Sequence, residues 1–192
     1  YYKGGLEAID ALVSTEYDRA APRGVGGVKA AGNYAPDVLP SAQAKDKGFP
    51  IVLYLDAQHQ KYVEEFSTSN FLGVTADGTL VAPSSPSILP SCTKGVVLQV
   101  ARDMGIKVEE RPLPYEELAH LREVAACGTA VVLTPIKSIT RGEEVIEYDS
   151  METIAALYKR VTDIQVADAP DPYGITRVVA EKPHDPAAPK VG

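Results

Sequence analysis

Cysteine, tryptophan and long apolar runs are scarce or missing in this sequence. Its 192 residues include two cysteines, Cys92 and Cys127, and no tryptophan. Two cysteines cannot form a disulfide scaffold, and these two are not spaced like paired metal ligands, so we expect a reducing compartment and no metal site. No apolar run approaches the roughly 18 residues of a membrane-spanning helix. We therefore expect no association with a membrane.

Positively charged residues are also too few and too dispersed for a nucleic-acid-binding surface. Lysine and arginine number 19 against 26 aspartates and glutamates, which gives a net charge of -7, and no block of basic residues occurs. Binding to nucleic acid or to an anionic membrane requires clustered positive charge. What the chain does have is 45% hydrophobic residues, enough to bury the core of one ordinary globular domain.

One lysine stands in an unusual setting, between a glycine-rich run and a small-residue run. The stretch is RGVGGVKAAGNYAP, from Arg23 to Pro36, and the lysine is Lys29. A phosphate-binding P-loop requires Gly-Lys followed directly by Ser or Thr. Here Val28 precedes the lysine and Ala30 follows it. A P-loop is therefore excluded, and the lysine needs another explanation.

Turn-forming residues divide the chain into short apolar segments of alternating character. We expect the buried-type run IVLYLDA to be a strand, and Thr93 to be the N-cap of a helix that ends at Gly105. Strand pairs mixed with helix crossovers predict an α/β or α+β domain with a mixed sheet. The expected strands span 11–20, 51–57, 61–74, 79–83, 106–113, 123–140 with a break at Gly128, and 144–148; the expected helices span 36–47, 93–104, 115–121 and 151–165.

The two ends of the sequence differ from the middle. From Ala167 onward the chain is rich in proline and lacks apolar periodicity, and we expect its last dozen residues to be disordered or laid over the surface. The sequence opens with Tyr-Tyr-Lys and not with Met. We therefore expect a further segment upstream.

Four blocks of sequence follow one another along the chain: VKAAGNYAP, LYLDAQHQKYVEEFSTSNFLGV, SILPSCTKGVVLQVARDMGIKVEER and EVAACGTAVVLTPIKSI. In this order and at this spacing, they together resemble the large C-terminal domain of branched-chain amino-acid aminotransferases. That family consists of class IV, fold-type IV enzymes that use pyridoxal phosphate. The resemblance implies a mixed sheet or pseudo-barrel with flanking helices. It also implies a large cofactor-binding domain over 1–166, in which 1–20 connects to a missing small domain, and a tail over 167–192.

The resemblance implies roles for three residues around the cofactor ring. Lys29 would hold pyridoxal phosphate as a Schiff base and move a proton at the substrate Cα. Glu65 would place its carboxylate at the pyridine nitrogen and keep that nitrogen protonated, with Glu64 on the opposite strand face as a solvated neighbour. Tyr34 would hydrogen-bond the phenolic oxygen of the cofactor.

The resemblance also implies how the phosphate and the substrate would be held. Cys92 and Thr93, at the start of a predicted helix, would bind the phosphate through their amides and the Thr93 hydroxyl. Thr129 would be a third phosphate ligand, next to Gly128, which permits a tight turn. Thr68 and the amide of Ala130 would bind the substrate carboxylate.

Taken as a whole, the resemblance implies transamination between branched-chain amino acids and 2-oxoglutarate. The substrates would be an amino acid and a 2-oxo acid, and the complete enzyme would be a homodimer in the cytoplasm or mitochondrion. The missing small domain, on the same or another chain, would supply an arginine for the phosphate and much of the side-chain pocket. Three alternatives share the fold and the lysine: a D-amino-acid transaminase, an (R)-amine transaminase and an aminodeoxychorismate lyase. A fourth is a truncated, non-catalytic domain that only binds a partner.

Overall fold

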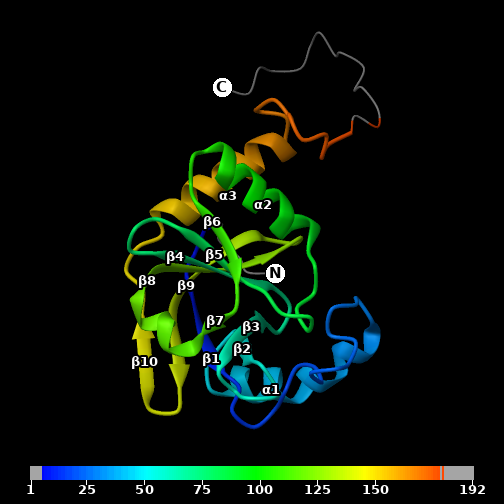
Figure 1. The fold of residues 1–192 in the computed structure, drawn as a ribbon, viewed down its shortest axis with the longest axis vertical. Helices are drawn as coiled ribbons and strands as arrows, with labels where there is room; N and C mark the ends of the chain where they lie inside the picture. Colours follow the sequence, from blue (N-terminus) through cyan, green and yellow to red (C-terminus); the bar gives the residue numbers. More distant parts are fainter. Residues whose placement is uncertain (1–5, 178, 180–192) are drawn as a thin grey trace.

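A closed ring of strands forms the centre of the fold (Figure 1). The computed structural model describes residues 6–177 and residue 179. Around the ring the strand order is β4, β8, β9, β1, β2 and β3, and β3 pairs again with β4. In that order the strands span Asn70–Thr75, Leu121–Gly128, Val132–Arg141, Ile9–Val13, Ile51–Leu55 and Tyr62–Phe66.

Further strands extend the ring at its edges. β5 (Leu80–Pro83) pairs with β4 and carries β6 (Val108–Arg111), while β7 (Leu113–Pro114) pairs with β3 and β10 (Glu144–Glu147) with β9. β1 runs parallel to both β2 and β9, whereas β8 is antiparallel to β4 and β9. The sheet is therefore mixed and closed, which confirms the expected fold class.

The core is divided between the interior of the ring and its outer faces. β2 is buried along its whole length because Ile51, Leu53 and Leu55 face the inner cluster, while Val52 and Tyr54 pack outward. Burial on both faces explains the continuous apolar run in its sequence. Inside the ring, the Phe66 and Phe71 rings stack with centroids 5.6 Å apart.

Helices cover opposite sides of the ring (Figure 1). α1 (Ala35–Asp46) packs through Ala44 on the outer face of β2, close to its expected range. α2 (Cys92–Asp103) and α3 (Glu152–Gln165) pack together over β8 and β9. Four α3 residues at helical spacing are fully buried, and each contributes about 1.5–3 kcal/mol by leaving water; they are Ile154, Leu157, Val161 and Ile164.

The prediction of one long strand over 61–74 is wrong. The segment forms two antiparallel strands, β3 and β4, in which Glu65 faces Asn70 and the Phe66 amide donates to the Ser69 carbonyl at 2.8 Å. The residues between them are Ser67, Thr68 and Ser69, which form turns without the help of glycine or proline. This turn carries polar side chains to the place where the ring closes.

Other boundaries also differ from expectation. The first strand ends at Val13, and the expected strand over 106–113 is split into β6 and β7 at Pro112. The expected helix over 115–121 is the 3-10 helix η2 (Tyr115–His120), and a second one, η1 (Ala31–Asn33), precedes α1. The N-cap of α2 is Ser91, not Thr93, because the Ser91 Oγ accepts a hydrogen bond from the Lys94 amide at 3.2 Å.

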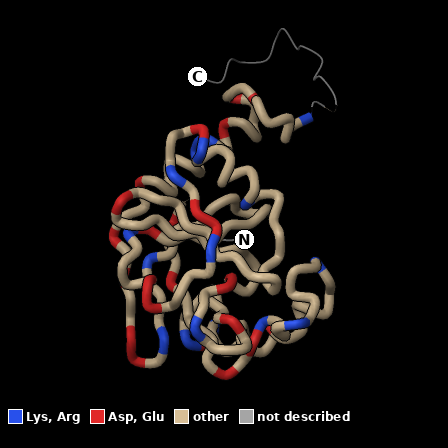
Figure 2. The backbone as a smooth tube through the Cα atoms, in the orientation of Figure 1, with Lys and Arg blue, Asp and Glu red and all other residues tan. Residues whose placement is uncertain are grey.

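After α3, the described part of the chain packs back on the molecule, where Ala169 and Tyr173 lie against the core cluster under α2 and α3. The Tyr173 hydroxyl donates to Asp103, at the end of α2, at 2.6 Å. The last dozen residues, for which we expect disorder, lie outside the described residues. Lysine and arginine are scattered along the chain among acidic residues (Figure 2). Within residues 6–177, no helix is both long enough and apolar enough to cross a membrane.

Candidate active site

A cavity of about 240 Å³ lies where the ring closes between β3 and β4. Its walls come from four segments: the loop before α1, the β3–β4 turn, the start of α2 and the β8–β9 turn. Most of the predicted site residues lie together on these walls, although they are far apart in the sequence. The residues of this set are Lys29, Tyr34, Glu65, Thr68, Cys92 and Thr129.

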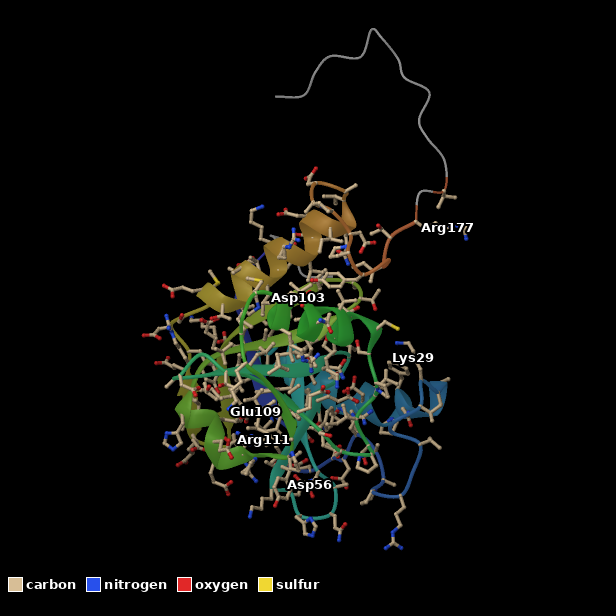
Figure 3. The ribbon with its side chains drawn as sticks, turned by 45° about the horizontal axis from the view of Figure 1, so that its top comes forward. Lys29, Asp56, Asp103, Glu109, Arg111 and Arg177 are labelled. Atoms are coloured by element: carbon tan, nitrogen blue, oxygen red, sulfur yellow. The ribbon has the colours of Figure 1, made fainter. Side chains whose placement is uncertain are left out.

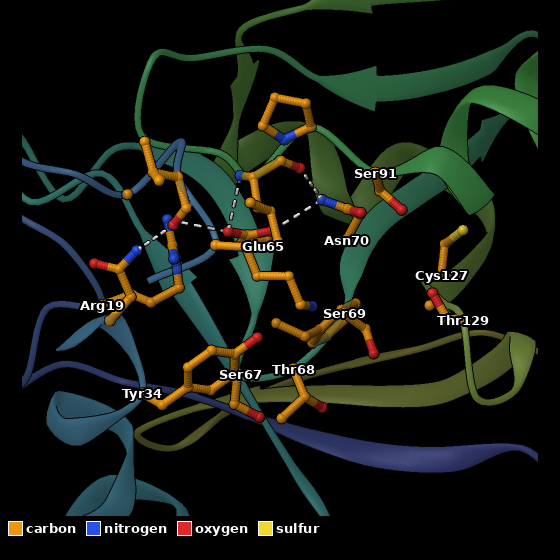
Figure 4. Close-up of a pocket in the computed structure, with 18 of the residues that line it drawn as sticks. Arg19, Tyr34, Glu65, Ser67, Thr68, Ser69, Asn70, Ser91, Cys127 and Thr129 are labelled. Atoms are coloured by element: carbon orange, nitrogen blue, oxygen red, sulfur yellow. Dashed lines mark hydrogen bonds and ion pairs between the residues drawn. The ribbon is translucent and has the colours of Figure 1, made fainter. Parts of the chain in front are cut away.

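Glu65 is buried at the centre of this site and is held by three donors (Figure 4). Its Oε1 accepts from the Leu89 amide at 3.2 Å and lies 3.0 Å from the Arg19 Nη2. Its Oε2 accepts from the Asn70 Nδ2 at 2.9 Å. Burial raises the pKa of Glu65 to about 7, and the Arg19 charge opposes that rise.

The prediction that Glu64 is solvated is wrong. Its side chain contacts the segment after β5, and only 4% of the residue is exposed. Its Oε1 accepts from the Ser85 hydroxyl at 2.8 Å. Burial raises the pKa of Glu64 as well. Two adjacent buried carboxylates therefore lie on β3, and only Glu65 lines the cavity.

Lys29 lies on a tightly folded loop between β1 and η1 (Figure 3). The Asn33 side chain holds this loop by donating through Nδ2 to the carbonyls of Val25, at 2.8 Å, and Val28, at 2.7 Å. The Lys29 Nζ lies 6.0 Å from the centre of the Tyr34 ring. We call these two hydrogen bonds the Asn33 clamp. They order the loop so that Lys29 lies at the cavity, beside the Tyr34 ring.

The opposite wall of the cavity is suited to an anion. Cys92 and Thr93 are the first residues of α2, whose leading amides have no acceptor within the helix and whose dipole favours negative charge. The Thr93 and Thr129 hydroxyls lie 3.3 Å apart, so two of the three predicted phosphate ligands meet, although Thr93 itself is not among the residues that line the cavity. Ala130 follows Thr129 in the β8–β9 turn and does not itself line the cavity.

At the connection between β8 and β9, the residue with a left-handed backbone conformation is not the glycine that the sequence suggested. Gly128 does not adopt a positive φ; Val132 does, at 59°. A β-branched residue in this region is a conformational outlier that costs on the order of 1–3 kcal/mol. The space at Gly128 is limited instead by a neighbour, because an added Cβ would come 3.3 Å from the Ser69 Oγ. The β8–β9 turn is therefore packed closely against the β3–β4 turn.

The sequence analysis missed three residues of this site. Arg19 and Asn70 contact Glu65, and Asn33 clamps the loop that carries Lys29. Of these, Asn33 and Asn70 stand within the blocks quoted above, so position in a block was a usable signal. Arg19 precedes the first block, and no local pattern in the sequence marks it.

Comparisons with known proteins find relatives along most of the chain. A family model described as amino-transferase class IV matches residues 6–139. The chain is 39% identical over 175 residues to a branched-chain-amino-acid aminotransferase of Helicobacter pylori, covering 90% of this chain and 52% of that protein. It is 42% identical over 193 residues to the aminotransferase atnJ of Emericella nidulans, covering 94% and 55%. A solved branched-chain amino acid aminotransferase of Thermobaculum terrenum in its PLP-form (holo-form) has a TM-score of 0.76 at 26% identity, covering 85% and 52%. The chain thus spans about half the length of these relatives.

Proposed function

We propose a function from one premise: this chain belongs to the class IV aminotransferases, whose family model matches residues 6–139. The resemblance to branched-chain aminotransferases is confirmed at this level by the relatives named above. On that premise, the chain is the cofactor-binding part of an enzyme that transfers the amino group of branched-chain amino acids to 2-oxoglutarate through pyridoxal phosphate. One observation carries the proposal: a loop lysine, a buried carboxylate, the N-terminus of α2 and Thr129 surround a single cavity, and the Thr93 hydroxyl lies 3.3 Å from that of Thr129.

The polar groups around the cavity are of the chemical types that pyridoxal phosphate requires. Lys29 offers the primary amine that attaches the cofactor, and Glu65 offers a buried acceptor for the pyridine nitrogen. Thr93, Thr129 and the first amides of α2 offer the phosphate site, and Tyr34 lies beside the lysine. When bound, the cofactor supplies an electron sink for the charge left at the substrate Cα.

Each side chain then has a physical task. Lys29 moves a proton at the substrate Cα, and the Asn33 clamp limits where its amine can reach. Glu65 fixes a proton at the ring nitrogen; because it is buried, water screens this interaction little. Thr68 binds the substrate carboxylate from the β3–β4 turn, and we keep the Ala130 amide as the second donor, although Ala130 lies one residue beyond the cavity lining in the β8–β9 turn. The two threonine hydroxyls orient the phosphate and hence the ring.

The remainder of the enzyme is also part of the proposal. Since the chain spans about half of its relatives, we infer that a small domain, on the same or another chain, completes the pocket and that the complete enzyme is a homodimer. Residues 1–166 would form the large domain, 1–20 its connection and 167–192 a tail. The compartment, cytoplasm or mitochondrion, stays a prediction that imaging of the tagged full-length protein would test.

Attachment of the cofactor to Lys29 is the direct test. The purified chain is incubated with pyridoxal phosphate, reduced with borohydride, and mapped by peptide mass spectrometry. We expect the label on Lys29, loss of the visible absorbance band in Lys29→Ala, and no change in Lys61→Ala, an exposed lysine elsewhere on the surface. Label distributed over other lysines with Lys29 unmodified would refute the proposal and favour a non-catalytic binding domain.

A further inference from the structure

Arg19 is a buried cation that the proposed chemistry does not yet use. It lies between β1 and the loop that carries Lys29, and its side chain is 7% exposed. A buried charge is unfavourable unless it is paired and hydrogen-bonded. The guanidinium meets this condition through Nη2, which lies 3.0 Å from the Glu65 Oε1 and also donates to the Ser87 carbonyl. Among the buried side-chain nitrogen and oxygen atoms of the described residues, only its Nε lacks a hydrogen-bond partner.

The contacts of Glu65 are unequal between its two oxygens. A carboxylate oxygen can accept about two hydrogen bonds. Oε1 receives the Leu89 amide and the Arg19 Nη2, whereas Oε2 receives only the Asn70 side chain. The guanidinium and the Leu89 amide thus occupy Oε1 and leave an acceptor position on Oε2. Figure 4 shows Arg19 and Asn70 on the two sides of the carboxylate.

Packing in the glycine run holds the guanidinium in place. A Cβ added to Gly26 would lie 3.0 Å from the Arg19 Nη2, 2.8 Å from the Ala20 Cβ, and against the Ser87 carbonyl. The absence of a side chain at Gly26 therefore makes room for Arg19. Through this contact the arginine touches the loop of Lys29, and through Nη2 it touches both Glu65 and the segment that leads to α2.

Several charged groups face Glu65, and Arg19 is the nearest cation. Glu64 is its buried neighbour on β3, Lys94 acts from α2, and Lys29 lines the same cavity from the loop before η1. Glu64 is satisfied by the Ser85 hydroxyl and makes no ion pair with Arg19 in the described structure. The single direct ion pair of Arg19 is therefore with the carboxylate that lines the cavity.

We propose that Arg19 is a positioning residue for Glu65: its guanidinium favours the charged form of the carboxylate and turns it so that Oε2 can accept a hydrogen bond inside the cavity. The use of that oxygen rests on the proposed function, in which a pyridine nitrogen is the donor. The coupling between the two side chains does not depend on it. The two statements are therefore tested by separate measurements.

The coupling is tested without cofactor, by nuclear magnetic resonance of the full chain labelled with ¹³C in the glutamate carboxyl groups. Glu65→Gln identifies the Glu65 signal. Because an opposite charge at this distance lowers a carboxyl pKa by about one to three units, the titration midpoint of Glu65 should rise by that amount in Arg19→Gln and stay near the parent value in Arg19→Lys. Arg23→Gln, which removes an exposed arginine of the same segment, should not move it.

Folding of each variant is confirmed by circular dichroism. If Arg19→Gln does not fold, Arg19→Met replaces it, since an apolar chain of similar length suits a buried position. A midpoint that stays at the parent value in the folded neutral variant overturns the proposal.

Pyridoxal phosphate affinity is then measured by absorbance. We expect at least about tenfold weaker binding in the neutral variant than in Arg19→Lys, since about one pKa unit of coupling corresponds to a tenfold change. Equal affinity would overturn the positioning role. A raised midpoint in a chain whose parent does not bind pyridoxal phosphate would support the coupling and refute the proposed function.

Discussion

At the scale of single residues, Glu65 makes the stability of the chain depend on pH. Burial raises its pKa from 4.5 to about 7. Between these values the unfolded chain has lost the proton while the folded chain keeps it, so the free energy of unfolding falls as pH rises. The stabilisation is fully present below about pH 4.5 and is lost as pH passes 7. Without cofactor, we expect a loss on the order of 3 kcal/mol over this window.

Glu65→Gln is the matched control for that prediction. It removes the titrating group and keeps an acceptor oxygen for Asn70 or Leu89, so its unfolding free energy should fall less between pH 5 and pH 8. Urea denaturation at both pH values measures the difference. Glu64 titrates in the same direction in both proteins, so it cancels in the comparison. Parallel pH profiles for parent and variant would contradict the prediction.

Asn33 should control the order of the loop that carries Lys29. In Asn33→Asp the side chain keeps its size but can no longer donate to the carbonyls of Val25 and Val28. Losing these two exposed hydrogen bonds should cost about 1 kcal/mol. Hydrogen exchange of residues 24–32 should become faster, while exchange in α3 stays unchanged. Unaltered protection in the loop would show that the clamp has no part in ordering it.

The residues that the sequence predicted and those it missed differ in kind. Lys29, Glu65 and Thr129 stand in blocks whose residue types are tied to one chemistry, and they do meet in one cavity. Arg19 contacts the Glu65 carboxylate and the Ser87 carbonyl, which are both far from it along the chain. Neither spacing nor composition therefore identifies it as a residue of the site. A sequence pattern can predict the side chains that a reaction requires. It does not predict the side chains that position them.

At the scale of elements, the sequence pattern located helices and strands better than it located the turn between β3 and β4. α3 shows helical spacing because only one stripe packs on the sheet. β2 is buried on both faces, and its continuous apolar run still marked it as a strand, whereas β3 is also buried on both faces but carries Glu64 and Glu65, and nothing in its sequence marks where it ends. The break between β3 and β4 came from Ser67–Ser69, which lack the glycine or proline that usually marks a hairpin.

Ser91 gives a prediction for the element that forms the anion site. As the N-cap of α2 it accepts from the Lys94 amide, so Ser91→Ala should lower stability by about 1 kcal/mol. Ser91→Asp should retain stability, because aspartate also caps, but should place a negative charge next to the proposed phosphate. We expect its affinity for pyridoxal phosphate to fall on the order of tenfold. Urea midpoints and absorbance titrations measure the two effects; equal affinity in Ser91→Asp and the parent would place the phosphate elsewhere.

At the scale of the whole molecule, several exposed apolar residues lie on, or close in sequence to, the loop that carries Lys29. Val28 and Tyr34 line the cavity and are 59% and 42% exposed, and three further apolar residues nearby in the chain are exposed as well, namely Val25, Val38 and Leu39. Exposed apolar side chains at the edge of a cavity, such as Val28 and Tyr34, are typical of an interaction surface. Together with the half-length match to the relatives, this surface supports the inference that another domain covers the cavity.

The last prediction separates cofactor binding from turnover. The chain alone should bind pyridoxal phosphate, because Lys29, Glu65 and the Thr93–Thr129 pair all lie on it. Its turnover with leucine, isoleucine or valine should be very low, because the groups that would close the cavity and bind the substrate side chain lie on the proposed second domain.

Steady-state transamination is measured before and after adding a separately produced small domain from the upstream coding sequence, with intact mass confirming the length of each chain. We expect activity to appear on mixing and to be absent when the added domain is paired with Lys29→Ala. Full activity of the 192-residue chain by itself would show that it already forms a complete site.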